Sequence, residues 1–252
     1  MQMKVLFTGQ VPKEPDFPDD IEDAIAQAAD DSRIVISDGA SESYDSKTWA
    51  RLLTARFRNH PELSQSWLTE AIVSYTARFD YANLSWSKQA AFARGSFATL
   101  LATIKSEESD AVNIFSVGDS LAVFLDNGEL LESFPYIRAE EFQQRPELLC
   151  TNIASNAFLF SSDFAETHHK IWLLQDKSNP VILCMTDALG EWALRHQEEG
   201  DPRWLQLAQI RDAAELESLV LQERESKSLR VDDVTLVNIS LIGCTKDELP
   251  DP

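Results

Sequence analysis

Aspartate residues recur at the ends of apolar runs along this sequence. Three of them directly follow such a run and one precedes the last run: Asp38, Asp119, Asp187 and Asp232. A carboxylate at the mouth of a buried strand is unfavourable unless it is paired or binds a metal ion. Each aspartate alone is typical of a cap or turn, but their recurrence predicts a ring of oxygen ligands where the strands converge. Such a ring suits magnesium or manganese rather than zinc.

The chemistry that such a site would support is hydrolysis of a phosphate ester. Two cations would lower the pKa of a bridging water, which then acts as the nucleophile, and would clamp the phosphoryl oxygens for in-line attack. No covalent intermediate is needed, in agreement with the missing motifs: the sequence contains no GxSxG, HExxH, GxxxxGK[ST] or GxGxxG. The four histidines have no zinc spacing, and we expect the pair His168-His169 to lie at the surface.

The order and context of the acidic elements resemble those of the metal-dependent protein phosphatases, the protein phosphatase 2C family. That family carries an Asn-Glu-Asp element, a strand ending in Asp-Gly, a Gly-Asp-Ser turn, a Ser/Thr-Asp-Gly-Leu element and a terminal Asp-Asn-x-Ser/Thr strand. The corresponding elements here are Ile21-Glu22-Asp23, Ser37-Asp38-Gly39, Val117-Gly118-Asp119-Ser120, Thr186-Asp187-Ala188-Leu189 and Asp232-Asp233-Val234-Thr235. The resemblance spans about residues 20 to 242.

This resemblance implies an α+β fold, a four-layer sandwich of two antiparallel sheets flanked by helices, with two Mn²⁺ or Mg²⁺ ions in the cleft between the sheet edges. It implies that Asp38 bridges the two ions and that the carbonyl of Gly39 binds one of them. Asp187 and Asp232 would complete the ligands of the second ion, and Asp119 would belong to a weaker third position.

The resemblance also implies roles for the acidic pair near the N-terminus and shows where this chain departs from the family. Glu22 and Asp23 would hold metal-bound waters and so belong to the catalytic residues. The family usually places a phosphate-binding arginine a few residues before this pair, where this chain has Pro18. Lys13 is the nearest upstream cation, and it offers a point charge without the bidentate fork of an arginine. After Asp-Gly many members have a histidine or a small residue that leads into glycines, whereas this chain has Ala40-Ser41-Glu42-Ser43.

The elements that must position these residues come in blocks rather than in strict alternation. Apolar runs predict strands at 33–37, 97–104, 112–116, 121–125, 129–134, 180–185 and 234–242, with Asp126-Asn127-Gly128 as a hairpin turn. Helical spacing predicts helices from Ser46, as the N-cap, through Phe57, over about 63–79 and 87–94, and at 189–198, 202–209 and 213–225. Hairpins beside blocks of helices favour antiparallel sheets with packed helices.

The segment 136–178 is the hardest to interpret, because short apolar pieces alternate with polar ones. Family members carry a variable flap in the corresponding stretch. Its cations Arg138 and Arg145 stand out in an acidic chain, and we expect them to bind a phosphorylated partner. The alternative is that much of the segment forms ordinary sheet strands with solvated charges.

Composition is typical of a globular protein, with 44% hydrophobic and 25% charged residues. The length suits one large domain or two small ones. Because no repeat or low-complexity linker marks a boundary, we expect a single domain over residues 1–252. The net charge of -20 argues against nucleic acid and anionic membranes as partners. The three cysteines have no CxxC spacing, and neither a secretory signal nor a long apolar run is present. We therefore expect a cytoplasmic protein, and we expect it to be a monomer.

The resemblance favours a metal-dependent serine/threonine protein phosphatase acting on phosphoserine or phosphothreonine in proteins. A second interpretation is a catalytically weak member that serves as a regulatory or binding module, which the missing arginine favours and the retained acidic residues oppose. A phosphatase for a small phosphorylated molecule is a third, and an acidic α+β domain without catalysis is the simplest alternative.

Overall fold

The computed structural model describes residues 2–242, and in this range it contains two five-stranded antiparallel sheets. The first sheet has the order β1 (Gln2–Val11), β12 (Val234–Ile242), β11 (Pro180–Met185), β7 (Leu121–Asp126) and β8 (Glu129–Phe134). The second has the order β10 (His169–Leu173), β6 (Ala111–Val117), β5 (Leu100–Lys105), β3 (Arg33–Ser37) and β2 (Ala24–Gln27). The short strands β4 (Phe97–Ala98) and β9 (Leu149–Cys150) form a separate pair.

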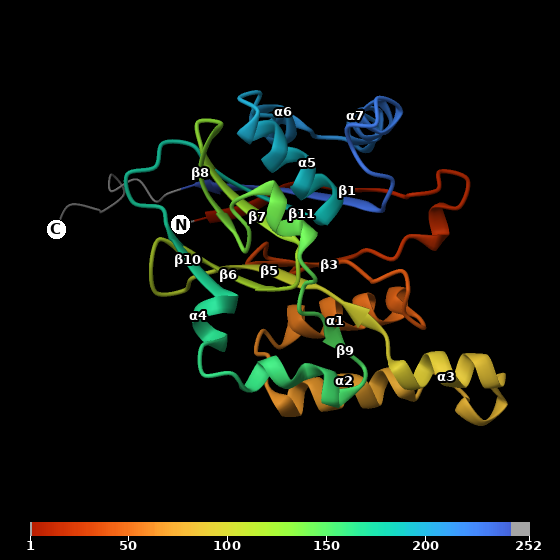
Figure 1. Cartoon of the computed structure of the whole chain (residues 1–252). Helices are drawn as coiled ribbons and strands as arrows, with labels where there is room; N and C mark the ends of the chain where they lie inside the picture. Colours follow the sequence, from red (N-terminus) through yellow and green to blue (C-terminus); the bar gives the residue numbers. More distant parts are fainter. Residues whose placement is uncertain (1, 243–252) are drawn as a thin grey trace.

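Helices cover the outer face of each sheet (Figure 1). Over the first sheet lie α5 (Asp187–Glu198), α6 (Trp204–Gln209) and α7 (Ala213–Glu225), and on the side of the second lie α1 (Ser46–Asn59), α2 (Gln65–Thr76), α3 (Trp86–Arg94) and α4 (Phe164–His168). Four 3₁₀ turns complete the described elements: η1 (Pro18–Asp20), η2 (Tyr81–Asn83), η3 (Ala139–Gln143) and η4 (Ile153–Phe160).

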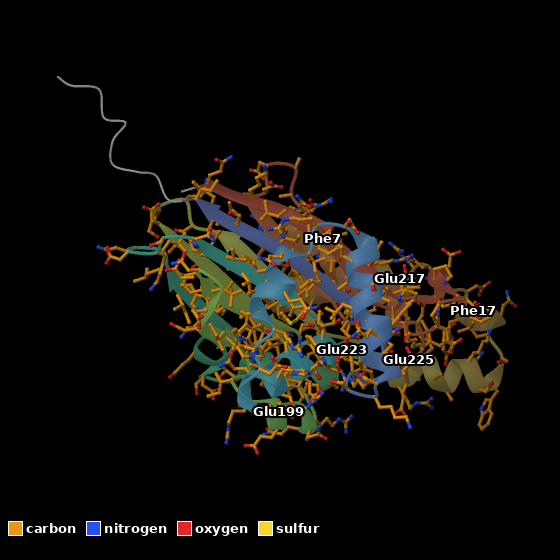
Figure 2. All side chains as sticks on the ribbon, turned by 90° about the horizontal axis from the view of Figure 1, so that it is seen from above. Phe7, Phe17, Glu199, Glu217, Glu223 and Glu225 are labelled. Atoms are coloured by element: carbon orange, nitrogen blue, oxygen red, sulfur yellow. The ribbon has the colours of Figure 1, made fainter. Side chains whose placement is uncertain are left out.

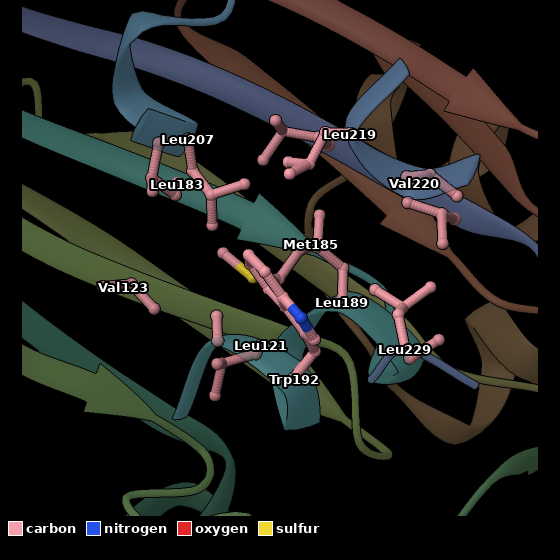
Figure 3. Close-up of a cluster of buried hydrophobic side chains, with 14 of the residues drawn as sticks. Leu121, Val123, Leu183, Met185, Leu189, Trp192, Leu207, Leu219, Val220 and Leu229 are labelled. Atoms are coloured by element: carbon pink, nitrogen blue, oxygen red, sulfur yellow. The ribbon is translucent and has the colours of Figure 1, made fainter. Parts of the chain in front are cut away.

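Three apolar clusters fill the spaces between these layers. One lies between the two sheets and includes Ile36, Leu101, Phe124 and Ile239. The second joins the first sheet to its helices, as Figure 3 shows for Leu121, Met185, Leu189, Trp192 and Val220. The third joins the second sheet to α1 and α2. The predicted four-layer α+β sandwich is therefore confirmed.

The N-terminal strand β1 was missed by the sequence analysis, and a bulge in it explains why. Val5 pairs with Ile239 and Phe7 with Asn238, so Leu6 is an extra residue in the ladder. The side chain of Met3 belongs to the cluster between the sheets, whereas that of Phe7 packs toward the helices. The bulge reverses the two faces of the strand, and no single alternating pattern describes its whole length.

The first helix begins where the sequence predicted, but its cap is a different residue. Ser46 is the first helical residue, and the carboxylate of Asp45 accepts a hydrogen bond from the backbone N–H of Thr48 at 2.9 Å. The aspartate therefore occupies the position in which a side-chain oxygen satisfies a free N–H group of the first turn. The hydroxyl of Ser46 instead points at Glu22.

The segment 136–178 contains η3, β9, η4 and α4 and ends in β10, the edge strand of the second sheet. The prediction that both His168 and His169 lie at the surface is wrong for the first of them. His168 is 7% exposed, and its Nδ1 lies 2.7 Å from the carbonyl oxygen of Ser116. A polar side chain is buried here because a backbone group satisfies it.

Within residues 2–242, none of the helices has the length and apolar character that crossing a membrane requires. Acidic side chains are prominent on the surface, as Figure 2 shows for Glu217, Glu223 and Glu225 along α7. Two cysteines, Cys150 and Cys184, are buried free thiols, while Cys244 lies outside the described residues.

Candidate metal-binding cleft

The topology of the second sheet brings two of the predicted residues to one edge. Strand β3 ends at Ser37, directly before Asp38, and Ser37 pairs with Ala24, the first residue of the antiparallel strand β2. Asp23 precedes Ala24. Because antiparallel neighbours end and begin at the same edge, the side chains of Asp23 and Asp38 meet there.

The first sheet likewise brings the other three aspartates to one of its edges. The last residue of β11, Met185, pairs with Leu121 at the start of β7 and with Leu236 near the start of β12. The residues just beyond these strand ends are Asp187, Asp119 and Asp232 respectively. Since the two sheets are packed face to face, their acidic edges open into one cleft.

A cavity of about 310 Å³ lies at this place. All five residues predicted to bind metal line it, and the full lining consists of Asp38, Gly39, Ala40, Ser41, Glu42, Thr99, Asp119, Pro146, Leu148, Asp187 and Asp232. The structure thus gathers into one concave site residues that are up to 194 positions apart in the sequence.

Asp23 lies beneath this cavity and is 2% exposed. Its Oδ2 accepts hydrogen bonds from the hydroxyls of Thr235, at 2.6 Å, and Thr186, at 3.1 Å. Its buried Oδ1 has no hydrogen-bond partner within the described part of the chain. Burial raises the pKa of Asp23 to about 7, against the opposing effect of the Thr235 hydroxyl.

The carboxyls that face the cavity also resist ionisation. Burial raises the pKa of Asp38 well above its usual value, and the negative charges of Asp23 and Asp119 add to the effect. Burial likewise raises the pKa of Asp119. Carboxylates crowded in this way are a functional-site signature, because a bound cation would remove the repulsion between them.

Thr99 holds the Asp38 loop and the Asp119 turn together. Its hydroxyl oxygen accepts from the backbone N–H of Asp38 at 2.8 Å and lies 2.8 Å from the hydroxyl of Ser120. Gly118 has φ of +101°, and a β-carbon there would lie 2.6 Å from a methyl group of Thr99. Both the backbone conformation and the close approach therefore require glycine at this position.

Gly39 meets a similar restriction beside Asp38. A β-carbon at Gly39 would lie 2.8 Å from that of Ser46 and 3.0 Å from the carbonyl oxygen of Glu22. The glycine allows the start of α1 to pack against the Asp-Gly loop, so that helix and loop fix the position of the backbone at the cavity wall.

Glu22 and Lys13 lie in a neighbouring cavity of about 390 Å³, which shares Ser41 with the cleft. The Nζ of Lys13 lies 2.7 Å from Oε2 of Glu22 and 3.0 Å from the hydroxyl of Ser41. Burial opposes the charge on Glu22, but hydrogen bonds from Lys13 and the two serines Ser41 and Ser46 outweigh it and lower its pKa. The pKa of Lys13 is raised, because its bond to Glu22 outweighs burial.

Asp233 lines this neighbouring cavity, and the sequence analysis gave it no role. Its two carboxylate oxygens accept the backbone N–H groups of Lys13 and Glu22, both at 2.7 Å. It is 4% exposed. The acidic pair at the start of β12 thus has two tasks: Asp232 faces the cleft, and Asp233 anchors the N-terminal segment.

Arg230 is the residue at the cleft that sequence reasoning missed altogether. Its Nη2 forms an ion pair with Oδ2 of Asp187, and its Nε lies 3.9 Å from Oδ2 of Asp232. No local motif indicated this, because Arg230 lies 43 positions after Asp187 in an unremarkable segment. The signal available in the sequence was that Arg230 lies close to Asp232, a predicted metal ligand, along the chain.

The two arginines predicted to bind substrate line neither cavity. Arg138 pairs with Glu140 at 2.7 Å, and its side chain is 62% exposed. Arg145 is exposed and directly precedes Pro146, which lines the cleft. Arg145 is therefore the sequence neighbour of a cleft-lining residue, whereas Arg138 is not.

The donor set suits magnesium or manganese. Its members are carboxylate oxygens and a backbone carbonyl, and the buried Oδ1 atoms of both Asp23 and Asp187 have no hydrogen-bond partner among the described residues. As the side chains stand, however, residues 2–242 contain no group of three or more His, Cys, Asp or Glu close enough to hold an ion. The ion pairs of Arg230 engage two of these carboxylates.

Comparison with solved structures identifies the fold. The photosystem II phosphatase PBCP matches with a TM-score of 0.58 and 15% identity over 96% of this chain and 100% of that chain. The catalytic domain of the serine/threonine protein phosphatase PstP, in complex with two manganese ions, matches with a TM-score of 0.56 and 15% identity, covering 96% and 99%. Stp1, a serine/threonine phosphatase from Staphylococcus aureus, gives 0.55 and 17%, covering 96% and 98%.

No family model matches the sequence, and no curated protein matches it either. The protein thus has the fold of the protein phosphatase 2C-type serine/threonine phosphatases over nearly its whole length, with a sequence that has diverged far from theirs.

Proposed function

We propose that the protein is a serine/threonine protein phosphatase that works with two Mn²⁺ or Mg²⁺ ions in the cleft between the sheet edges. The observation that carries this proposal is that Asp38, Gly39, Asp119, Asp187 and Asp232 line one cavity. The fold shared with serine/threonine phosphatases supports it.

In this proposal Asp38 would contribute to both ions and the Gly39 carbonyl to one of them. Asp187 and Asp232 would hold the second ion, and Asp119 would belong to a weaker third position. When bound, the ions supply an activated water as nucleophile and withdraw charge from the phosphoryl oxygens. Burial raises the pKa values of Asp38 and Asp119 in the metal-free protein, and neighbouring carboxylates add to the effect at Asp38, which fits carboxylates that need a cation.

Glu22 and Asp23 orient water at the edge of the site. The pKa of Glu22 is lowered by its hydrogen bonds, so this carboxylate is an acceptor at neutral pH. Asp23 titrates near pH 7 in the metal-free protein and can hold or release a proton at its Oδ1. Lys13, at the neighbouring cavity, adds positive charge beside Ser41, where the cavity and cleft meet.

The substrate that we infer is a phosphorylated protein rather than a small ester. The neighbouring cavity of about 390 Å³ extends the cleft along Phe17, Tyr44 and Lys47, which suits a peptide that continues beyond its phosphoryl group. Arg145, beside the cleft, adds local positive charge to an anionic protein, which would help a phosphorylated partner to approach.

The decisive experiment is hydrolysis of p-nitrophenyl phosphate by chelator-treated protein with added Mn²⁺ or Mg²⁺. We expect activity only with added metal. The Asp187→Asn variant should lose at least about 100-fold in turnover, as expected when an electrostatic contact in the transition state is removed, whereas Glu107→Gln, on the exposed β5–β6 turn, should be unchanged. Full activity in excess chelator, or none with any metal, would contradict the proposal.

A second candidate function is a phosphatase-like regulatory module of low activity. Two observations favour it: Pro18 stands where the family usually places its phosphate-binding arginine, and Arg230 engages two of the proposed ligands. The same assay separates the two candidates, because a regulatory module would hydrolyse p-nitrophenyl phosphate slowly or not at all with either metal.

A further inference from the structure

A guanidinium group stands at the carboxylates proposed to hold the second ion. Arg230, in the segment between α7 and β12, pairs through Nη2 with Oδ2 of Asp187 and places Nε 3.9 Å from Oδ2 of Asp232. The Arg230 side chain is 41% exposed, whereas that of Asp187 is 16% exposed. The cation therefore reaches into the acidic site from its solvent-facing side.

We propose that Arg230 is a built-in counter-ion of the cleft, which competes with a divalent cation for Asp187 and Asp232 and so sets the metal affinity of the protein. This inference rests on the proposed function, since it assigns a role to a residue at the same site. Arg230 is here a positioning residue rather than a catalytic one.

Other cations near the cleft are held by different partners. Lys13 pairs with Glu22, and Arg224 donates to the backbone carbonyl oxygens of Pro12 and Asp232. Among the ion pairs of residues 2–242, those of Arg230 are the ones that join a cation to carboxylates of the cleft. Arg230 therefore offsets the mutual repulsion of the aspartates most directly.

The two cations compete most directly at Asp232. Its Oδ1 accepts the backbone N–H of Asp233 at 3.0 Å, so an ion there would take Oδ2, the oxygen that faces Arg230. A divalent ion needs the carboxylate oxygens at about 2.0 to 2.6 Å, and its charge repels a guanidinium at the same atoms. Arg230 therefore has to move outward when the ion binds. Its exposure provides that route. Metal binding is thus an exchange of one cation for another, and its free energy is reduced by that of the broken ion pair.

The test is calorimetric titration of Mn²⁺ into the full-length, chelator-stripped protein without substrate. Arg230→Gln removes the charge, and we expect it to bind Mn²⁺ about twofold to fivefold more tightly than the natural chain, the effect of losing one partly exposed ion pair. The matched control is Arg203→Gln, whose ion pair with Asp201 at 2.6 Å has a similar exposure, 34% for the arginine, and does not line the cleft. This control should bind as the natural chain does.

Equal or weaker binding by Arg230→Gln would overturn the inference and leave the proposed function intact. Binding by Arg230→Gln alone would support the inference and contradict the proposed function of the natural chain. Absence of binding by both proteins would contradict both.

A second measurement uses the natural chain, and a variant is needed only to assign the signal. In the ¹⁵N-labelled natural chain, the Nε–H signal of Arg230 should shift as Mg²⁺ is added, while that of Arg203 stays in place. The signal is assigned by its loss in Arg230→Lys, because a lysine side chain has no guanidinium Nε–H group. An Arg230 signal that does not respond to saturating Mg²⁺ would overturn the proposal.

Discussion

The hydroxyl of Thr235 donates a hydrogen bond of 2.6 Å to Asp23, across the gap between the two sheets. Thr235 belongs to β12 of the first sheet, whereas Asp23 begins the turn into β2 of the second. Thr186, at the end of β11, donates to the same oxygen. The relative position of the sheets, and with it the width of the cleft, is therefore tied to a buried carboxyl group.

The first prediction concerns the pH dependence of stability in the metal-free protein. The pKa of Asp23 is about 7 in the folded chain and 3.8 for a free side chain, so between these values the folded state binds a proton that the unfolded state has released. The linked stability is complete below pH 3.8 and is lost as the pH rises through 7. A difference of about three pKa units corresponds to at most about 4 kcal/mol.

Urea unfolding in chelator at pH 5.5 and pH 8.5 checks this prediction. We expect the free energy of unfolding to fall by about 2 kcal/mol toward the higher pH, and Asp23→Asn to reduce that fall. An equal fall in Asp23→Asn would show that other groups cause the pH dependence.

The second prediction separates metal binding from folding at Asp38. Because Asp38 is buried and also crowded by Asp23 and Asp119, Asp38→Asn removes a carboxyl whose charge is disfavoured and should leave the metal-free protein at least as stable as the natural chain. Its turnover of a phosphate ester should nevertheless fall by at least about 100-fold. Thermal unfolding in chelator and steady-state kinetics at saturating Mn²⁺ measure the two effects. Near-normal turnover would show that Asp38 is not a ligand.

The third prediction concerns the turn that carries Asp119. Gly118→Ala would combine an unfavourable backbone conformation with a clash against Thr99, and we expect it to cost about 1 to 3 kcal/mol of stability. Gly200→Ala is the matched control, because Gly200 also has a positive φ, of +79°, but a β-carbon there would have nothing within 4 Å. A loss no greater than that of the control would show that the contact with Thr99 is unimportant.

The fourth prediction separates substrate recognition from the chemical step. Arg145 directly precedes a residue that lines the cleft, whereas Arg138 is paired with Glu140. Arg145→Ala should therefore raise the KM for a phosphopeptide several-fold, and Arg138→Ala should do so less. Both should leave hydrolysis of p-nitrophenyl phosphate nearly unchanged. An equal loss on both substrates would indicate structural damage, and no loss on either would place recognition elsewhere.

Sequence reasoning predicted those features that are local in the chain. The Asn127-Gly128 hairpin is an example: both residues have positive φ, as a tight hairpin turn requires. It also located the strand-end aspartates, because each adjoins an apolar run. It could not predict Arg230, whose partners are set by tertiary contacts, or the pair β4–β9, whose two-residue strands are too short for a periodic pattern.

Because of the bulge in β1, the number of residues in this strand is more important for its pairing than the identity of the bulged residue, Leu6. The extra residue, Leu6, brings Gln10 opposite Thr235, to whose hydroxyl it donates at 3.0 Å, and that hydroxyl holds Asp23. Deleting Leu6 would shift every later residue of the strand by one place and turn Gln10 to the opposite face. Along this lineage, exchanges of Leu6 for other residues should be tolerated, whereas insertions and deletions between residues 5 and 11 should be rare.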